Sequence, residues 1–154
     1  MGLTPGLSTA ADLFHKLQRD VERLNQEITS DDFFDFVITG YSLIDWVKND
    51  PSLPATAKSQ SEIASLYQEP WLKVCGELAN ASKHFTLTKQ TPITSSATST
   101  RGFGEGGHGK GRYGVGEESI EVAISNGSTW MALEFAAGVI QAWLVFFRRN
   151  GIKV

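Results

Sequence analysis

The chain of 154 residues is 41% hydrophobic and 20% charged, and its net charge is −3 at neutral pH. These values predict one globular domain over 1–154 with a core of its own, and they exclude a protein that is drawn to nucleic acid or anionic membranes by overall positive charge. Cys75 is the only cysteine in the sequence, which excludes an intramolecular disulfide and is compatible with a cytoplasmic location.

The first third of the chain carries two helical patterns. Thr9 opens an acidic variant of the capping box, and apolar residues then follow at alternating spacings of three and four: Phe14, Leu17, Val21, Leu24 and Ile28. This pattern predicts a helix over about 9–28, with its charged residues, Asp20 among them, facing solvent. A second helix is predicted from a cap at 29–32 to Lys48, and its wide apolar arc indicates more than one neighbour. We expect the aspartates of this helix to complement its N-terminal dipole and to lie on its exposed face.

Two further helices are predicted after a proline-containing loop. Ser59 and Glu62 form a capping box, which predicts a short helix through Tyr67. Pro70 suits the first turn of the next helix, where its missing N–H costs nothing. That helix, Trp71–Phe85, separates apolar from polar side chains at helical spacing. Its apolar side carries Trp71, Val74, Cys75, Leu78 and Phe85, and its polar side carries Lys73, Glu77, Asn80, Lys83 and His84.

The sequence period changes after this helix. Residues 86–88 are compatible with the start of a strand, and residues 92–116 are rich first in Ser and Thr and then in Gly. Because such a composition cannot bury a core, we predict a flexible insertion over 92–116. Residues 120–124 then alternate between apolar and polar or small side chains, which predicts a half-buried strand. The pair Asn126-Gly127 predicts a hairpin turn after it.

A last helix is predicted over 132–149, and it is apolar nearly all round, which places it at the centre of the fold. Within it, the apolar stretch 131–147 carries Glu134 and Gln141 and is too short for a membrane span, so no membrane association is expected. The predicted fold is mainly α. It is an up-and-down bundle of four main helices and one short helix, with a small β-hairpin and a Gly/Ser-rich insertion before the last helix.

Motif matches for cofactor and metal sites fail on context. Gly102, Gly104 and Gly107 match the letters of the dinucleotide-binding fingerprint, but that motif needs a strand before it and a helix after it, and here a Ser/Thr-rich coil precedes and a strand follows. The three histidines stand in different predicted elements and lack the paired spacing of metal ligands. We therefore expect no cofactor and no metal.

The polar side of the helix Trp71–Phe85 is the candidate catalytic site. Asn80 and His84 are neighbours at i and i+4, and Lys83 adds a cation beside them. Imidazole titrates near neutrality and lysine stabilises negative charge at a phosphate, so these three residues have the chemistry of metal-independent phosphodiester cleavage. Lys73 and Glu77 are candidate ligand-binding residues on the same stripe. The alternative is a solvated helix face with an ordinary ion pair.

The insertion holds a second candidate binding segment. Arg101, Lys110 and Arg112 are interleaved with Phe103 and Tyr113, a pattern typical of segments that contact single-stranded nucleic acid through charge and stacking. The alternative is a solvated loop, which the composition favours.

The predicted bundle and the segment Asn80–His84 together resemble the HEPN superfamily (higher eukaryotes and prokaryotes nucleotide-binding domains). The resemblance implies a small, often dimeric helical bundle that is either a metal-independent ribonuclease of toxin–antitoxin or phage-defence systems or a non-catalytic binding module. The motif of the family places an arginine and a polar residue before a histidine. Here His84 matches the histidine and Asn80 the polar residue, and no arginine occurs over 71–84.

The missing arginine favours a HEPN-like binding or interaction module. The alternatives are a ribonuclease that uses His84 and a purely structural homo-oligomer. The expected partners are RNA or a nucleotide and a second copy of the chain, because the surplus of apolar residues on the second and last helices predicts a homodimer.

Overall fold

The computed structural model describes residues 4–84, 93–100 and 119–154, without the side chains of 82–84. Within these residues the prediction of a mainly helical protein with a small amount of β-structure is confirmed. The elements follow in the order α1 (Ala10–Gln26), α2 (Ser30–Asn49), η1 (Ala55–Lys58), α3 (Gln60–Gln68), α4 (Pro70–His84), β1 (Thr94–Thr100), β2 (Ser119–Ile124), β3 (Thr129–Met131) and α5 (Ala132–Arg149).

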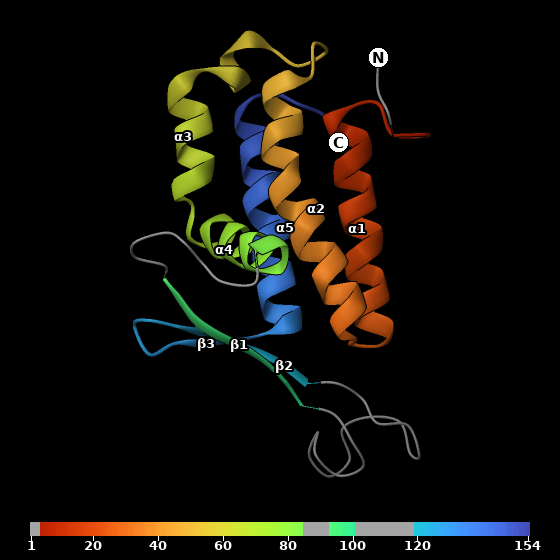
Figure 1. Cartoon of the computed structure of the whole chain (residues 1–154). Coiled ribbons are helices and arrows are strands. Elements are labelled where there is room, and N and C mark those ends of the chain that lie inside the picture. The colour runs from red at the N-terminus through yellow and green to blue at the C-terminus, as the bar shows by residue number, and fades with distance from the viewer. Residues whose placement is uncertain (1–3, 85–92, 101–118) are drawn as a thin grey trace.

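The helix α4 crosses the others. In Figure 1, α1, α2, α3 and α5 run up or down the page and α4 is seen nearly end-on, with the sheet below them all. This differs from the predicted up-and-down bundle of four main helices. Two glycines let α4 approach its neighbours closely. A Cβ on Gly76 would lie 2.4 Å from the Tyr41 ring of α2, and a Cβ on Gly138 of α5 would lie 2.3 Å from the Trp71 indole of α4. Large side chains at these two crossing points would hold the helices apart.

The helix starts are fixed by the caps that the sequence predicts. The Thr9 hydroxyl accepts a hydrogen bond from the Asp12 N–H, and the Asp12 carboxylate accepts one from the Thr9 N–H, both at 3.0 Å. The Ser59 hydroxyl accepts the Glu62 N–H at 3.3 Å and caps α3, but the predicted capping box is only half formed, because the Glu62 carboxylate accepts from Arg149 instead. Asp50, which follows α2, adds a long-range cap, because its carboxylate accepts the N–H of Ala10 at 2.8 Å. The first turn of α1 is therefore tied to the end of α2.

The helix α5 lies at the centre of the core and contacts α2 at Gly40. A Cβ at Gly40 would lie 3.1 Å from Cys75 Sγ of α4, 3.4 Å from Val139 of α5 and 3.6 Å from Leu17 of α1. The indole N–H of Trp143 donates to the Gly40 carbonyl oxygen at 3.2 Å. The bounds and the central position predicted for the last helix are confirmed by its buried rings: Phe135, Trp143, Phe146 and Phe147. No described helix combines the length and the apolar character that a membrane span requires.

The three strands pair antiparallel in the order β1–β2–β3. The β2–β3 hairpin turns at Asn126-Gly127 as predicted, and the glycine has a φ of +94°. The flexible insertion predicted over 92–116 is wrong for 94–100, which form β1. The reason is that pairing with β2 supplies hydrogen bonds that a Ser/Thr-rich sequence does not signal by itself. The rest of that prediction, 101–116, and the strand start suggested at 86–88 lie outside the described residues.

One acid of α1 is buried, so its predicted solvent-exposed position is wrong. Asp20 is fully buried, accepts a hydrogen bond from Lys16 Nζ at 2.9 Å and forms an ion pair with Arg23. Lys16 and Arg23 each also pair with Asp35 of α2 at 3.1 Å. Asp20 stands three residues after buried Leu17, on the stripe of α1 that faces its neighbours. The contact between α1 and α2 is therefore partly ionic.

Candidate functional site

The polar side of α4 differs from its prediction at Glu77, of which only 1% is exposed. Its carboxylate accepts two backbone hydrogen bonds, from the Ile93 N–H to Oε2 at 2.9 Å and from the Thr94 N–H to Oε1 at 2.8 Å. The predicted exposed position of Glu77 is therefore wrong, because both of its oxygens hold the chain that enters β1. Lys73 is half-buried and has no ion pair with Glu77 or with any other described acid. A ligand-binding role for these two residues stays a prediction.

Asn80 is half-buried and hydrogen-bonds through its side chain to Tyr41 of α2. Burial raises the pKa of Tyr41, the neighbouring Tyr67 raises it further, and the hydrogen bond to Asn80 opposes both. Asn80 therefore already has a partner within the protein. The other predicted site residues lie outside the described side chains: Lys83, His84, Arg101, Lys110 and Arg112. The catalytic role of Asn80, Lys83 and His84 stays a prediction.

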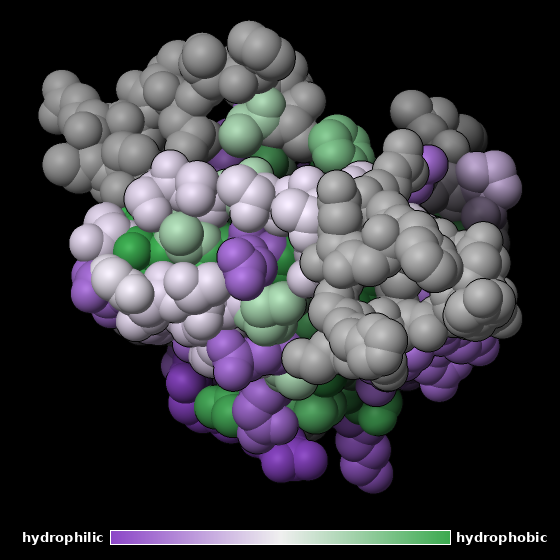
Figure 2. Space-filling view, turned by 90° about the horizontal axis from the view of Figure 1, so that it is seen from below, coloured by the Kyte–Doolittle hydropathy of each residue, from purple (hydrophilic) through white to green (hydrophobic). Residues whose placement is uncertain are grey.

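A groove of about 310 Å³ opens between α2, α4 and the sheet, and we call it the α2–α4–β1 groove. None of the described residues that line it is charged. Three carry hydroxyl groups, and the others are apolar: Phe33, Phe34, Val37, Leu78, Ala81, Ala97 and Ile120. The sheet side of the molecule (Figure 2) shows hydrophobic residues open to solvent among the pale ones. The groove therefore has the character of a site for apolar groups.

The ring of Phe34 stands at this groove with 48% of the residue exposed, whereas Phe33 is buried and packs against Phe135 of α5 with ring centroids 5.8 Å apart. The helices cover β1 less completely than β2 at this groove: Val122 of β2 is buried, but its cross-strand partner Ala97 is exposed. Sequence reasoning missed this site. The available signal was the Phe33–Phe34 doublet, since consecutive helical residues point about 100° apart and two such rings do not enter one core together.

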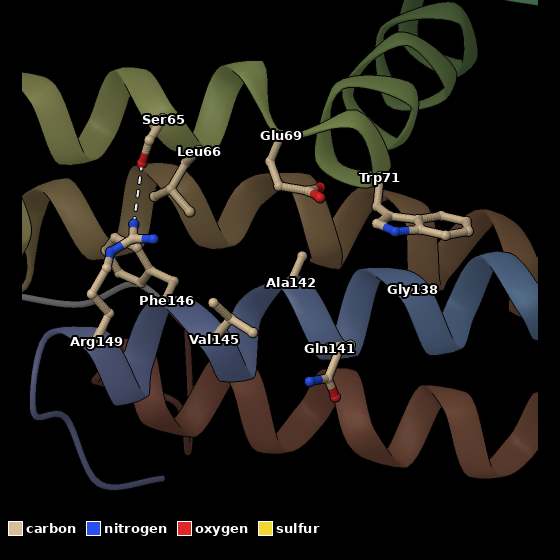
Figure 3. A pocket seen from close by; sticks show the side chains of 10 residues that line it. All are labelled: Ser65, Leu66, Glu69, Trp71, Gly138, Gln141, Ala142, Val145, Phe146 and Arg149. Atoms are coloured by element: carbon tan, nitrogen blue, oxygen red, sulfur yellow. Dashed lines mark hydrogen bonds between the residues drawn. The ribbon is translucent and has the colours of Figure 1, made fainter.

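A second groove, of about 220 Å³, lies between α3, α4 and α5, and we call it the α3–α4–α5 groove (Figure 3). Its charged residues are engaged. Arg149 donates to Glu62 Oε2 at 2.6 Å and to Ser65 Oγ at 3.3 Å, and the hydrogen bond from Arg149 holds the pKa of Glu62 below its ordinary value. Glu69 accepts the Leu72 N–H at 3.0 Å and so caps α4. Burial raises the pKa of Glu69, and its hydrogen bonds oppose that rise.

Trp71 closes one end of the α3–α4–α5 groove. Its indole packs at a tilt of 32° against the ring of Trp130 of β3, with ring centroids 4.0 Å apart, and it lies against Gly138, as Figure 3 shows. The charged residues and the indole of this groove therefore already have partners within the protein, and Gln141 and Val145 form its exposed edge on α5. The α2–α4–β1 groove instead leaves an aromatic ring half-exposed.

The described residues bring together no recognisable catalytic group. No cluster of three or more His, Cys, Asp and Glu side chains among them has the geometry to hold a metal ion. Cys75 is fully buried and hydrogen-bonds to the Val37 carbonyl oxygen at 3.2 Å, and burial raises the pKa of its thiol. A nucleophilic thiolate at this position is therefore excluded.

Comparison with known proteins gives no relative: the sequence matches no protein-family model, and neither a curated protein nor a solved structure is significantly similar to it. A functional argument for this chain therefore rests on its residues and their geometry. The two grooves and the exposed faces of the helices are the features on which it depends.

Proposed function

We propose that the chain is a non-catalytic binding module of the HEPN-like, helical-bundle kind, which takes up an apolar side chain of a partner protein in the α2–α4–β1 groove. The observation that carries this proposal is the half-exposed ring of Phe34 beside an uncharged groove of about 310 Å³. A groove of this size accepts one or two side chains rather than a whole small domain.

The energetics favour an apolar occupant. Complete burial of a large apolar side chain contributes about 1.5–3 kcal/mol, and an occupant of the groove would cover Phe34 as well as itself. Among the residues that the structure describes, no charged side chain lines the groove, so entry of such a group requires none of them to be desolvated as a charge. Hydroxyl groups at the β1 side, such as that of Thr98, supply polar atoms at the rim.

Three observations favour binding over the ribonuclease alternative. Asn80, the candidate orienting residue, already hydrogen-bonds to Tyr41, and Glu77 is committed to the backbone before β1. The arginine of the family motif is absent over 71–84. The ribonuclease alternative requires RNA cleavage that persists in EDTA and that His84→Ala abolishes.

The position of the groove in the chain keeps nucleic acid as a competing occupant. Ala81, which lines the groove, precedes Lys83 by two residues, and Thr100, the end of β1, directly precedes Arg101. A nucleotide would combine a base in the groove with phosphate contacts to such cations. The purely structural alternative requires no occupant of the groove at all.

The test uses the fluorescent apolar probe anilinonaphthalene sulfonate at neutral pH, with Phe34→Ser as the variant. Met131→Ser is the matched control, because Met131 is an apolar side chain of similar exposure, 43%, that does not line the groove. We expect the Phe34 variant to bind the probe at least about fivefold more weakly and the control to bind as the wild type does. Equal binding by all three proteins would contradict the proposal.

A parallel titration with a single-stranded RNA oligonucleotide, with EDTA present, distinguishes the alternatives. We expect neither cleavage nor tight binding. Cleavage that is lost in His84→Ala would replace the binding module by the ribonuclease. RNA binding that is lost in Phe34→Ser would keep the groove as the site and change its occupant.

A further inference from the structure

The outward side of α5 carries three polar residues at a regular interval. Glu134, Gln141 and Arg148 are seven residues apart and all exposed, so they lie on one stripe about two turns from each other. Within the described part of the chain, the side chains of Glu134 and Arg148 form no ion pair or hydrogen bond. The stripe is therefore an exposed row of an acid, an amide and a base. Within the described residues, neither the acid nor the base stabilises the fold through a salt bridge.

Apolar residues flank this row. Val145, which together with Gln141 forms the α5 edge of the α3–α4–α5 groove, is 47% exposed, and Leu133 is 38% exposed. Ala137 is also exposed, and Ile140 and Leu144 are half-buried. A helix that only had to cover the core would carry polar residues at such positions. The homodimer predicted from the sequence relied on surplus apolar residues of the second and last helices. On α2 the exposed apolar residues are Phe34, which belongs to the α2–α4–β1 groove, and Ile38, whereas α5 exposes Leu133, Ala137 and Val145. The last helix therefore has the larger exposed apolar surface and is the candidate interface.

We propose that this face of α5 binds a second copy of the chain, with the two α5 helices antiparallel about a two-fold axis at Gln141. The positions of the residues make the face complementary to itself. Glu134 and Arg148 each lie seven residues from Gln141, about 10 Å along the axis, so the acid of one copy meets the base of the other at both ends. Ala137 and Val145 each lie four residues from it, so a small side chain meets a larger one.

The same charges reject the other orientation. A parallel pair would place Glu134 beside Glu134 of the partner copy and Arg148 beside its own counterpart, and like charges in contact oppose association. The charge order along α5 therefore specifies an antiparallel pair. A single helix pair covers less than the about 1,200 Å² that is usual for stable interfaces, so a reversible dimer is expected.

The experiment is sedimentation velocity of the full chain from about 5 to about 200 µM, compared among charge variants. Wild type should form a dimer within this range. Glu134→Arg and Arg148→Glu should each raise the dissociation constant at least about tenfold, because each places like charges at both ends of the interface. The double variant, with both substitutions, should restore association to within about threefold of the wild type, since it exchanges the two charges.

Matched controls come from exposed residues of α1. Glu22→Arg and Arg19→Glu make the same charge changes away from α5, and they should leave the dissociation constant unchanged. Circular dichroism melting of every variant checks that the fold is retained. A wild type that stays monomeric over the whole range would overturn the proposal. So would a dimer that survives both single reversals, or a double variant that dissociates as readily as the singles.

Discussion

The two grooves that α4 shares with its neighbours differ in how far their side chains are already satisfied. The α3–α4–α5 groove lies at the N-terminal end of α4. Its lining includes Arg149, Glu69 and Trp71, each of which has a partner inside the protein. The α2–α4–β1 groove lies at the C-terminal half of α4. The described side chains that line it are uncharged, and the ring of Phe34 is half-exposed. The α3–α4–α5 groove contains the titratable side chains. The α2–α4–β1 groove contains the half-exposed aromatic ring, whose burial by a partner would be favourable.

This difference shows why titratable residues alone are a poor guide to a binding site in this protein. The sequence predicts Glu77 on the polar side of its helix, yet its carboxylate anchors the entry to β1, and the carboxylate of Glu69 caps α4. Their carboxylates are used by backbone N–H groups of the same chain. An exposed aromatic ring has no comparable internal use, and burial by a partner lowers its free energy.

The largest expected effect on stability comes from disrupting the close packing of α4 against α5 at Gly138. Gly138→Ala places a Cβ 2.3 Å from the Trp71 indole, so α4 and α5 must move apart, and we expect a loss of about 3 kcal/mol in the free energy of unfolding. Urea unfolding followed by tryptophan fluorescence measures it. Ala64→Ser, at an exposed position of α3, is the control and should change stability by less than about 0.5 kcal/mol. A stabilised Gly138→Ala protein, as expected for an open helix surface, would show that the close packing of Trp71 is wrong.

A smaller effect is expected at Glu77, which positions the β1 side of the other groove. Glu77→Gln leaves the N–H of Ile93 or of Thr94 facing an amide N–H₂ group instead of an oxygen. We expect this change to lower the free energy of unfolding by about 2 kcal/mol. Amide hydrogen exchange in 94–100 should quicken more than exchange in α5. Glu121→Gln, an exposed acid of β2, should have neither effect. Unchanged exchange in β1 would mean that Glu77 does not hold this strand.

Phe34→Ser should separate binding from stability. The ring is half-exposed, so its loss should lower the free energy of unfolding by less than about 1 kcal/mol while it removes the apolar edge of the α2–α4–β1 groove. Thermal melting by circular dichroism measures the stability. A loss as large as that of Gly138→Ala would place the ring in the core and contradict its exposed position.

The smallest effect concerns the pH dependence at Glu69. Burial raises the pKa of Glu69 above its ordinary value of 4.5, so the folded chain holds this proton more tightly than the unfolded chain does. Its stabilising contribution is complete below that ordinary value and is lost as the pH rises through the folded pKa. Compared with Glu69→Gln, the wild type should therefore lose about one to two degrees of melting temperature between acid and neutral pH. A wild type that gains melting temperature relative to Glu69→Gln over the same pH range would contradict the burial of Glu69.

The parts of the fold that follow from local sequence could be predicted. The caps at Thr9 and Ser59, Pro70 in the first turn of α4 and the bounds of α5 depend on neighbouring residues, and all are found as predicted. The crossing of α4 depends on Gly76 and Gly138 meeting rings from other helices, and no local pattern encodes that contact.

The failures are at residues whose environment comes from distant segments. Glu77 was placed on a solvent-exposed side because its partners, Ile93 and Thr94, lie 16 and 17 residues further along the chain. Asp20 carried a signal in its three-residue spacing from Leu17, but its charge suggested an exposed position. The half-exposed ring of Phe34 lies beside β1, whose position is set by its pairing with β2, a contact between segments that are distant in the sequence.

The central claim is that the α2–α4–β1 groove, and not the α3–α4–α5 groove, receives apolar groups. The direct measurement is a titration of the isotope-labelled chain with anilinonaphthalene sulfonate, followed by backbone amide chemical shifts. The account predicts the largest shifts at Phe33, Phe34, Val37 and Leu78, with Ser65, Glu69 and Gly138 unchanged, and it predicts that Phe34→Ser removes the pattern. Shifts centred on Ser65, Glu69 and Gly138, or a pattern that persists in Phe34→Ser, would contradict it.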